Sequence, residues 1–187
     1  LRNGRKEDEM KTYYDSGYLK EVWHFVDDTL DGKAYRYFEN GIIQTELDFI
    51  KGVQKGITKE YSENGTLKAE YFYDNDVRNG IALAYYPNGI LKSVSNYKDD
   101  RLNGERKTYH ENGILQSEEN LEDGNIIGAR KVYHKDGSVF REEYYLNNAL
   151  DGWVKIFSST GKLVKEEYYL SGILQRSRDY DDKVNLI

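Results

Sequence analysis

Glycine recurs along this chain at a fixed interval of 24 residues, without an insertion or a deletion. One series has seven members and a second has six: Gly17, Gly41, Gly65, Gly89, Gly113, Gly137 and Gly161, then Gly32, Gly56, Gly80, Gly104, Gly128 and Gly152. Internal similarity at a period of roughly 20 to 50 residues is typical of arrays in which one structural unit is stacked many times. The chain is therefore expected to be a repeat protein with one unit per period.

Each period has the pattern of a β-hairpin. Residues 90–98 and 104–110 mix polar residues with apolar and aromatic ones, and the residues between them are turn formers. We therefore expect an all-β fold: a single antiparallel sheet, elongated, twisted and curled, built from about seven consecutive hairpins or about 14 strands. The whole chain would be one repeat domain, with a partial repeat at 1–16, six full repeats at 17–160, and a final partial repeat with a C-terminal cap at 161–187.

The glycines of the first series indicate the type of hairpin loop. The residue before the glycine is Asn in four units, but it is Ser16, Asp136 and Thr160 in the others. A two-residue type I′ turn needs positive φ at both positions, which a β-branched threonine strongly disfavours. A three-residue loop, a type I turn followed by a G1 bulge, needs positive φ only at the glycine. This loop would place Tyr109 opposite Leu115 and Tyr85 opposite Leu91.

Composition excludes several classes of protein. The net charge is −6 with 27 basic and 33 acidic residues interspersed, which gives no electrostatic reason for binding to nucleic acid or to anionic lipid; membrane lipid stays a possible partner that the net charge does not support. The absence of cysteine rules out disulfides and thiolate chemistry. No apolar run approaches the roughly 18 residues that span a bilayer. The chain begins at Leu1, which is compatible with an exported or surface-associated mature protein, and the compartment is left open.

No residue is predicted to be catalytic, to bind a cofactor or to hold a metal. His110 and His134 occupy the same position of successive repeats and, with His24, are interpreted as polar surface residues. The acidic second loops are interpreted as turn chemistry rather than as calcium sites. Two charged columns are interpreted as a solvated ladder: Glu46, Glu70, Glu118, Glu142 and Glu166, with Lys59, Lys107, Lys131 and Lys155.

The units YHENGILQSEENLEDGNIIGARKV (109–132) and YYPNGILKSVSNYKDDRLNGERKT (85–108) resemble the bacterial variant of MORN repeats. The resemblance extends from about Tyr13 to about Leu174. It implies an elongated β-hairpin array that serves in binding, tethering or dimerisation and has no shared active site. Because this group is often labelled the antitoxin component of a toxin–antitoxin pair, it also implies an alternative role as a neutraliser of a toxin.

The repeats differ most at their C-terminal end, where large apolar side chains replace polar ones. Lys or Gln of earlier units gives way to Phe140 and Val164, and Asp or Asn gives way to Tyr144 and Tyr168. Extra apolar surface needs a cover, which could be the tail at 180–187 acting as a cap, or a partner or second copy. The predicted partner-binding residues are Phe140, Tyr144, Leu146, Trp153, Ile156, Val164, Tyr168 and Leu170.

The function expected from these features is that of a non-enzymatic scaffold without a cofactor, which binds a partner protein or a second copy of itself. The alternatives are the antitoxin-like neutraliser and a lipid- or glycan-binding surface that uses the tyrosine columns. An enzyme would need a pocket with converging unlike residues, which a repeated surface seldom supplies.

Overall fold

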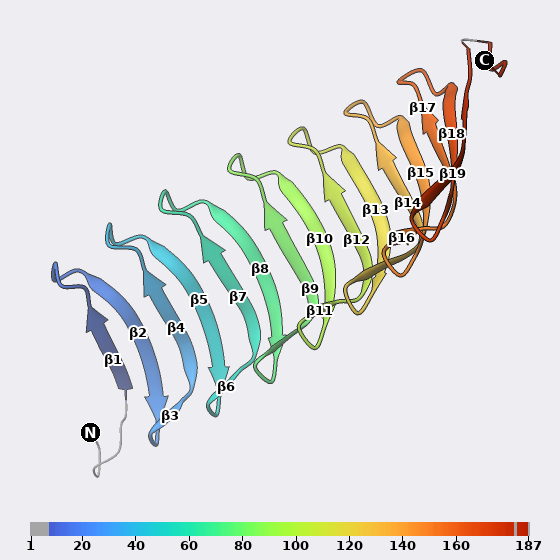
Figure 1. Ribbon diagram of the computed structural model, residues 1–187. Helices are drawn as coiled ribbons and strands as arrows, with labels where there is room; N and C mark the ends of the chain where they lie inside the picture. Colours follow the sequence, from blue (N-terminus) through green and yellow to red (C-terminus); the bar gives the residue numbers. More distant parts are fainter. Residues whose placement is uncertain (1–7, 182, 187) are drawn as a thin grey trace. The chain divides into compact units, whose positions relative to one another are not determined.

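A computed structural model describes residues 8–181 and 183–186 (Figure 1). Within these residues all regular elements are β-strands, and the nineteen strands are assigned to one antiparallel sheet of consecutive hairpins. The predicted all-β hairpin array is therefore confirmed, while the curl of the sheet stays a prediction. No helix in the described part of the chain is long and apolar enough to cross a membrane.

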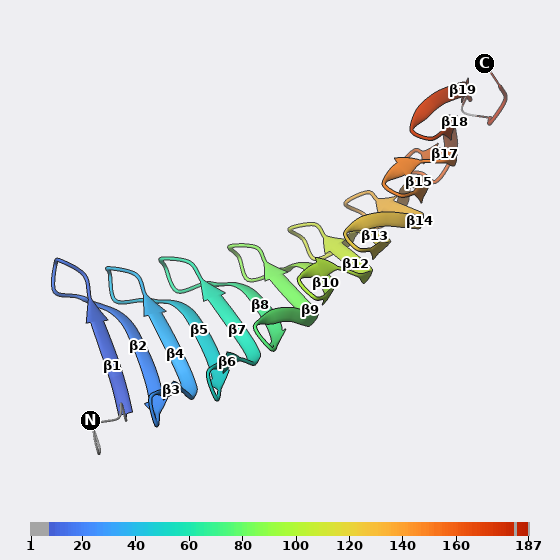
Figure 2. The same ribbon diagram turned by 60° about the horizontal axis from the view of Figure 1, so that its bottom comes forward.

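The chain divides into two compact units, the first ending at Gly89 and the second beginning at Ile90. Within each unit the strands follow one another as hairpins in chain order (Figures 1 and 2). Unit 1 contains β1 (Asp8–Tyr13), β2 (Leu19–Val26), β3 (Thr29–Leu30), β4 (Gly32–Tyr37), β5 (Ile43–Ile50), β6 (Val53–Gln54), β7 (Gly56–Tyr61), β8 (Leu67–Asp74) and β9 (Val77–Tyr85). Unit 2 contains β10 (Leu91–Lys98), β11 (Arg101–Leu102), β12 (Gly104–Tyr109), β13 (Leu115–Glu122), β14 (Asn125–Tyr133), β15 (Val139–Leu146), β16 (Ala149–Leu150), β17 (Gly152–Phe157), β18 (Leu163–Leu170) and β19 (Ile173–Asp179).

Bulges near the second glycine series raise the number of strands above the expected value of about 14. In the hairpin of β15, Tyr145 pairs with Leu150, whereas Glu142 pairs with Lys155, so β16 and β17 together have two residues more than β15 over the same length. Gly152 lies inside this bulge with φ of 124°, a conformation that side chains with a Cβ disfavour. The bulge divides the second strand of the hairpin into two short strands.

The loops of the first glycine series are the predicted three-residue loops with a G1 bulge. In the loop closed by Gly113, the His110 N–H donates to the Ile114 carbonyl and the Gly113 N–H donates to the His110 carbonyl, both at 2.8 Å. Gly113 has φ of 84°, and the register shifts by one residue so that Tyr109 pairs with Leu115. The predicted pairing of Tyr109 is thereby confirmed.

The turns at the other end of the hairpins are of a different type. Both central residues have positive φ, for example 48° at Asn147 and 64° at Asn148, as a two-residue type I′ turn requires. The Asn148 N–H donates to the Ile126 carbonyl of the preceding repeat at 3.0 Å, and the Asn148 side chain accepts from the Ile126 N–H at 2.6 Å. These turns therefore also connect successive repeats.

Side chains of the three-residue loops connect the repeats at the opposite end. His110 Nε2 lies 3.0 Å from the Tyr133 carbonyl oxygen, and His134 Nε2 lies 3.3 Å from that of Phe157. The Asn112 amide donates to the Lys135 carbonyl at 2.9 Å. His110 and His134, two of the three histidines predicted to be polar surface residues, are thus part-buried links between repeats.

The two faces of the strands have different environments. In unit 1 one face carries the buried residues Ala34, Leu47, Ala69 and Ala82, and we call the corresponding side of each unit the buried face. The other side, the open face, carries the predicted charged ladder with its tyrosines. There Lys131 lies 3.4 Å from Glu142, and the Tyr133 hydroxyl donates to Glu118 at 2.5 Å.

Replacing Gly113 by alanine should lower the free energy of unfolding by about 1 to 2 kcal/mol, because alanine disfavours the left-handed backbone that the loop requires. A Cβ at this position would meet only an ordinary contact at 3.8 Å, so conformation rather than space decides the effect. Gly113→Asn should cost less, since asparagine tolerates this region better. Urea unfolding of the three proteins measures the order, and equal stability of all three would contradict the proposed loop strain.

Tyr133 should make stability depend on pH in the alkaline range. Burial of the phenol and its hydrogen bond to Glu118 raise the pKa of Tyr133 to about 12 from 10.0. A raised pKa in the folded state gives a contribution that is fully present below pH 10 and is lost as the pH rises towards 12. Tyr133→Phe should therefore lose less stability than wild type between these pH values in urea unfolding; an identical loss would contradict the assignment.

Candidate interaction surface

Five of the predicted binding residues lie together on the open face of unit 2, and we call them the C-terminal apolar face: Tyr144, Leu146, Trp153, Tyr168 and Leu170. Every second residue of a strand lies on the same face of the sheet. Tyr144 and Leu146 of β15 therefore share a face, and so do Tyr168 and Leu170 of β18. Trp153 of β17 pairs directly with Tyr168, and Glu142 pairs with Lys155, so the three strands present these side chains on the same side.

The aromatic centre of this face is a contact between two rings. The centroids of Trp153 and Tyr168 are 5.3 Å apart with an interplanar angle of 50°, a tilted arrangement favourable for aromatic pairs. The guanidinium of Arg178 on β19 lies 5.0 Å from the centroid of Trp153, close enough for a cation–π interaction. The aromatic pair is therefore bordered by positive charge from the last strand.

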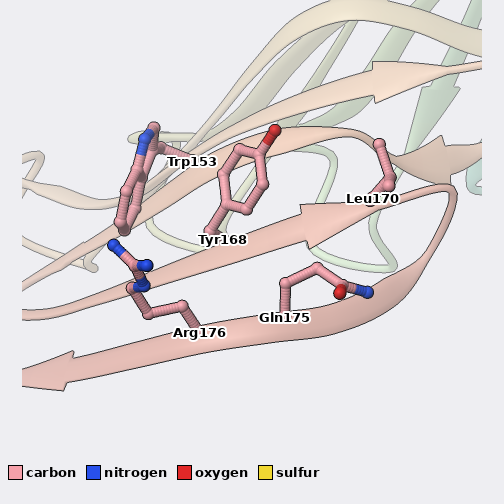
Figure 3. A pocket seen from close by; sticks show the side chains of 5 residues that line it. All are labelled: Trp153, Tyr168, Leu170, Gln175 and Arg176. Atoms are coloured by element: carbon pink, nitrogen blue, oxygen red, sulfur yellow. The ribbon is translucent and has the colours of Figure 1, made fainter.

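A shallow groove of about 590 Å³ runs over the aromatic pair. It is lined by Trp153, Tyr168, Leu170, Gln175 and Arg176. Figure 3 shows the two rings on neighbouring strands, with Gln175 and Arg176 on the strand beyond them. The groove thus combines apolar and aromatic surface with one amide and one cation.

The described residues leave the C-terminal apolar face open to solvent. Tyr144, Leu146 and Leu170 are 52%, 57% and 52% exposed, and Trp153 is 37% exposed. The tail runs from the end of β19, where the Tyr180 hydroxyl donates to Glu166 at 2.7 Å, and Leu186 is itself exposed. Within residues 180–181 and 183–186, the tail therefore does not cover this face.

The other three predicted binding residues lie outside the C-terminal apolar face. Phe140 is near the loop end of β15, with its ring centroid 4.9 Å from that of His134. Val164 lies on the same face of β18 as Tyr168, but at the end of the strand next to the loop. Its carbonyl accepts the Tyr180 N–H at 3.0 Å. Ile156 pairs with Arg141 and lies on the buried face. The structure therefore does not bring Ile156 together with the aromatic pair.

The buried face of unit 2 holds a network of ion pairs that sequence reasoning missed. The side chain of Glu119 is fully buried; its two oxygens accept from the Nε atoms of Arg106 and Arg130, at 2.5 and 2.7 Å. Arg130 Nη1 also lies 3.1 Å from Glu143, whose other oxygen is 2.9 Å from Arg141 Nε. The signal was present as Glu119, Glu143 and Glu167 at the 24-residue period.

Three positions of this network are apolar in repeats of unit 1. Arg106 and Arg130 occupy the position of Ala34 and Ala82, and Glu119 occupies that of Leu47. Buried charges must be paired with good geometry, because their desolvation is unfavourable. Since the carboxylates and guanidinium groups bind one another here, the network has the character of a structural support.

Sequence reasoning also missed a smaller apolar cluster on the open face of unit 1. Ile57, Phe72 and Ile81 are 49%, 42% and 58% exposed and line a shallow pocket. They stand at the same positions of the repeat as Trp153 and Tyr144. The cluster has no tryptophan and no arginine among its lining residues, so it offers a matched control for the C-terminal apolar face.

The acidic second loops act mainly as backbone acceptors. Asp76 accepts from the Gln54 N–H at 2.8 Å, and Asp151 accepts from the Ser171 N–H at 3.2 Å. Among the described residues no group of three or more His, Cys, Asp or Glu has an arrangement that could hold a metal ion.

Comparison with protein families agrees with the observed repeats. A sequence profile described as "MORN repeat variant" matches five segments of the chain: residues 30–51, 54–75, 78–99, 102–123 and 126–147. A search of curated proteins found no match to the chain.

Three similar solved structures are distant in sequence and have low TM-scores. The crystal structure of TcdB2-TccC3-Cdc42 contains a chain 13% identical, with a TM-score of 0.27, over 91% of this chain and 12% of that one. The crystal structure of TcdB2-TccC3 gives 12% identity and a TM-score of 0.22, over 92% and 14% of the two chains. A protein of unknown function from Bacteroides fragilis gives 12% identity and a TM-score of 0.15, over 98% of both. These likenesses carry no argument about function.

Removing the Glu119 carboxylate should destabilise unit 2 strongly. Glu119→Ala removes the buried acceptor of Arg106 and one of the two buried acceptors of Arg130, for which a loss of about 3 kcal/mol is expected. Glu105, whose side chain is 55% exposed, supplies the control: Glu105→Ala should change the free energy of unfolding by less than about 1 kcal/mol. Urea unfolding at neutral pH compares the two, and similar losses would show that Glu119 has no special role.

Proposed function

The chain belongs to the MORN repeat variant family, and on that basis we propose that it is a non-enzymatic scaffold that binds another protein, or a second copy of itself, through its C-terminal hairpins. MORN repeats are generally protein-interaction modules, which supports this class of function. The observation that carries the proposal is the C-terminal apolar face, on which Tyr144, Leu146 and Leu170 are each more than half exposed beside Trp153.

The composition of this face is that of a protein interface. Tyr, Trp and Arg are enriched among residues that contribute most to binding between proteins. Here Trp153 and Tyr168 are in contact, and Arg178 lies over the Trp153 ring. A partner that covers the aromatic pair would remove water from it, while the neighbouring cations remain available for polar contacts.

Several charged groups elsewhere in unit 2 are paired within the chain. Glu119 and Glu143 bind arginines, and the open-face tyrosines donate to glutamates, as Tyr133 does to Glu118. These pairings support a structural role for the polar columns and leave the C-terminal apolar face as the candidate binding surface.

The repeats themselves indicate substitutions that alter this face without altering the fold. Asn96 and Asn120 occupy the position of Tyr144, and Lys33 occupies the position of Trp153. The double variant Tyr144→Asn/Trp153→Lys should therefore remain folded. Ile57→Lys makes the equivalent change on the open face of unit 1 and serves as its control.

The double variant should weaken binding by at least about 30-fold, because truncating an interface hot spot costs about 2 kcal/mol or more. Self-association is measured by sedimentation equilibrium, and hetero-association by calorimetry with a purified partner obtained by affinity capture. Ile57→Lys should behave like wild type in both. If the double variant is folded and binds as wild type does, the C-terminal apolar face is not the binding surface.

A further inference from the structure

We propose that the partner of the C-terminal apolar face is a second copy of this chain, packed face to face about a twofold axis that runs parallel to the strands between β15 and β17. This inference rests on the proposed function, because it uses the same surface and names the molecule that covers it. Two features of the open face of unit 2 carry it: the order of the charges along the face and a hollow beside the aromatic pair. The strands concerned, β13 to β18, are each bordered on both sides by another strand of the sheet.

Charges of opposite sign alternate in one row across the open face of unit 2. Each residue of this row pairs with the next one on the neighbouring strand: Glu118, Lys131, Glu142, Lys155, Glu166 and Arg178. The sign therefore changes at every step from β13 to β19. Within the chain this order supports neighbouring strands, as in the contact of 3.4 Å between Lys131 and Glu142. It also determines which surfaces the row can face, because Lys131 and Lys155 are exposed.

The alternation of charge makes the row complementary to itself in one type of register. A twofold axis that lies between two packed sheets, parallel to their strands, keeps each residue at its own height along the strand. When this axis lies between β15 and β17, Glu142 of one copy faces Lys155 of the other, and Lys131 faces Glu166. Two packed sheets keep their strand directions within about 30° of each other, so residues near the axis stay opposite one another. The charges that face each other then have opposite signs.

Other kinds of axis set unfavourable groups together. An axis along the middle of β15 places Glu142 over its own copy, and an axis along β17 does the same for Lys155. An axis perpendicular to the strands has this result for the whole row, or, when it crosses at the height of Trp153, it places Glu142 over Leu146. Like charges that face each other, and charges that face apolar surface, are unfavourable in an interface. The row therefore favours an axis that runs between two strands.

A hollow beside the C-terminal apolar face distinguishes among the axes of this kind. It has a volume of about 470 Å³ and is lined mainly by residues of β12, β13 and β14. Its residues Asn120, Glu122 and Ala129 are exposed, and a Cβ at Gly128 would meet nothing within 4 Å beyond its chain neighbours. Ala129 pairs with Tyr144 of the C-terminal apolar face. The hollow therefore lies directly next to the aromatic side chains.

The axis between β15 and β17 fills this hollow with side chains of the second copy. It sets Tyr168 of one copy opposite Ala129 of the other, so a large ring meets the smallest side chain of its row. It also brings the cation of Arg176, which is exposed beside the groove, to the exposed carboxylate of Glu122. Size and charge both fit a second copy in this register.

Axes one strand to either side fit less well. An axis between β17 and β18 sets Tyr168 over Trp153 and moves Arg176 away from Glu122. An axis between β14 and β15 sets Tyr168 over Glu105, which is an exposed carboxylate. Of the three, the axis between β15 and β17 places the rings over the hollow and the cation beside the acid.

The full chain should therefore form a dimer, which sedimentation equilibrium detects over a range of concentrations. Ala129→Trp should weaken this dimer at least about tenfold, because the new ring fills the hollow that Tyr168 of the second copy occupies. Trp153 already stands at the same position of its own repeat, so the fold should tolerate the change. Ile57→Trp makes the equivalent change in unit 1 and should leave the dimer as it is. The double variant Tyr144→Asn/Trp153→Lys, whose two positions face each other across the axis, should be monomeric at concentrations at which the wild type is a dimer.

Cross-linking between single-cysteine variants tests the register, since the chain has no cysteine of its own. A mixture of Ala129→Cys and Tyr168→Cys, treated with a short bismaleimide, should give a cross-linked dimer that neither variant gives alone. A mixture of Glu105→Cys and Tyr168→Cys should give little product, because the axis between β15 and β17 does not place these positions opposite each other.

Three results would overturn the inference in different ways. A chain that stays monomeric while it binds another protein through the C-terminal apolar face would contradict the second copy and leave the proposed function standing. A dimer that the folded Tyr144→Asn/Trp153→Lys variant still forms would contradict both. A dimer that Ala129→Trp does not weaken, or in which Tyr168→Cys is cross-linked as well to Glu105→Cys as to Ala129→Cys, would contradict the register.

Discussion

Each surface of this protein depends on the bulged three-residue loop, because that loop decides which side chains share a face. The shift of one residue at Gly113 sets Tyr109 opposite Leu115. Since side chains alternate along a strand, a loop one residue longer or shorter would exchange the two faces of the strand that follows. The tyrosine and glutamate columns of the open face and the arginine–glutamate network of the buried face could then not form. One glycine per repeat therefore secures the register on which both faces rely.

The sequence was sufficient to predict the hairpins, the loop type and the pairing of Tyr109, since these follow from local backbone preferences and from alternation. It did not reveal which face would be buried. Glu118 and Glu119 are adjacent and chemically identical, yet one accepts a tyrosine hydroxyl on the open face and the other is enclosed by arginines. The difference arises because Glu119 faces arginines of both neighbouring strands, Arg106 on β12 and Arg130 on β14. Ile156 was grouped with Trp153 for the same reason, because composition was considered without the side on which each residue lies.

Within unit 2 the usual distribution of side chains is partly reversed. Its buried face is supported by ion pairs of Glu119 and Glu143, whereas Tyr144, Leu146 and Leu170 are exposed on the open face. A repeat array permits this arrangement because each unit contacts only its neighbours, so the columns can change chemistry along the chain while the backbone stays the same. In unit 1 the corresponding buried residues are uncharged: Ala34, Leu47, Thr58 and Ala82. Unit 2 therefore buries only part of its apolar side chains, Leu121 and Val154 among them, and exposes others on the open face.

The bulge of the last hairpin is one residue shorter than that of the hairpin before it. Tyr169 pairs with Leu174 and Tyr168 with Arg176, whereas the bulge between β15 and β17 contains two additional residues. Even so, Arg178 and Tyr180 both reach Glu166, as a lysine and a tyrosine do in other repeats. Insertions and deletions of single residues can therefore be absorbed at the bulge, and units of 23 and 24 residues can coexist in one array. Natural length variation in such arrays would accordingly accumulate at this point of the unit and be excluded from the glycine loop.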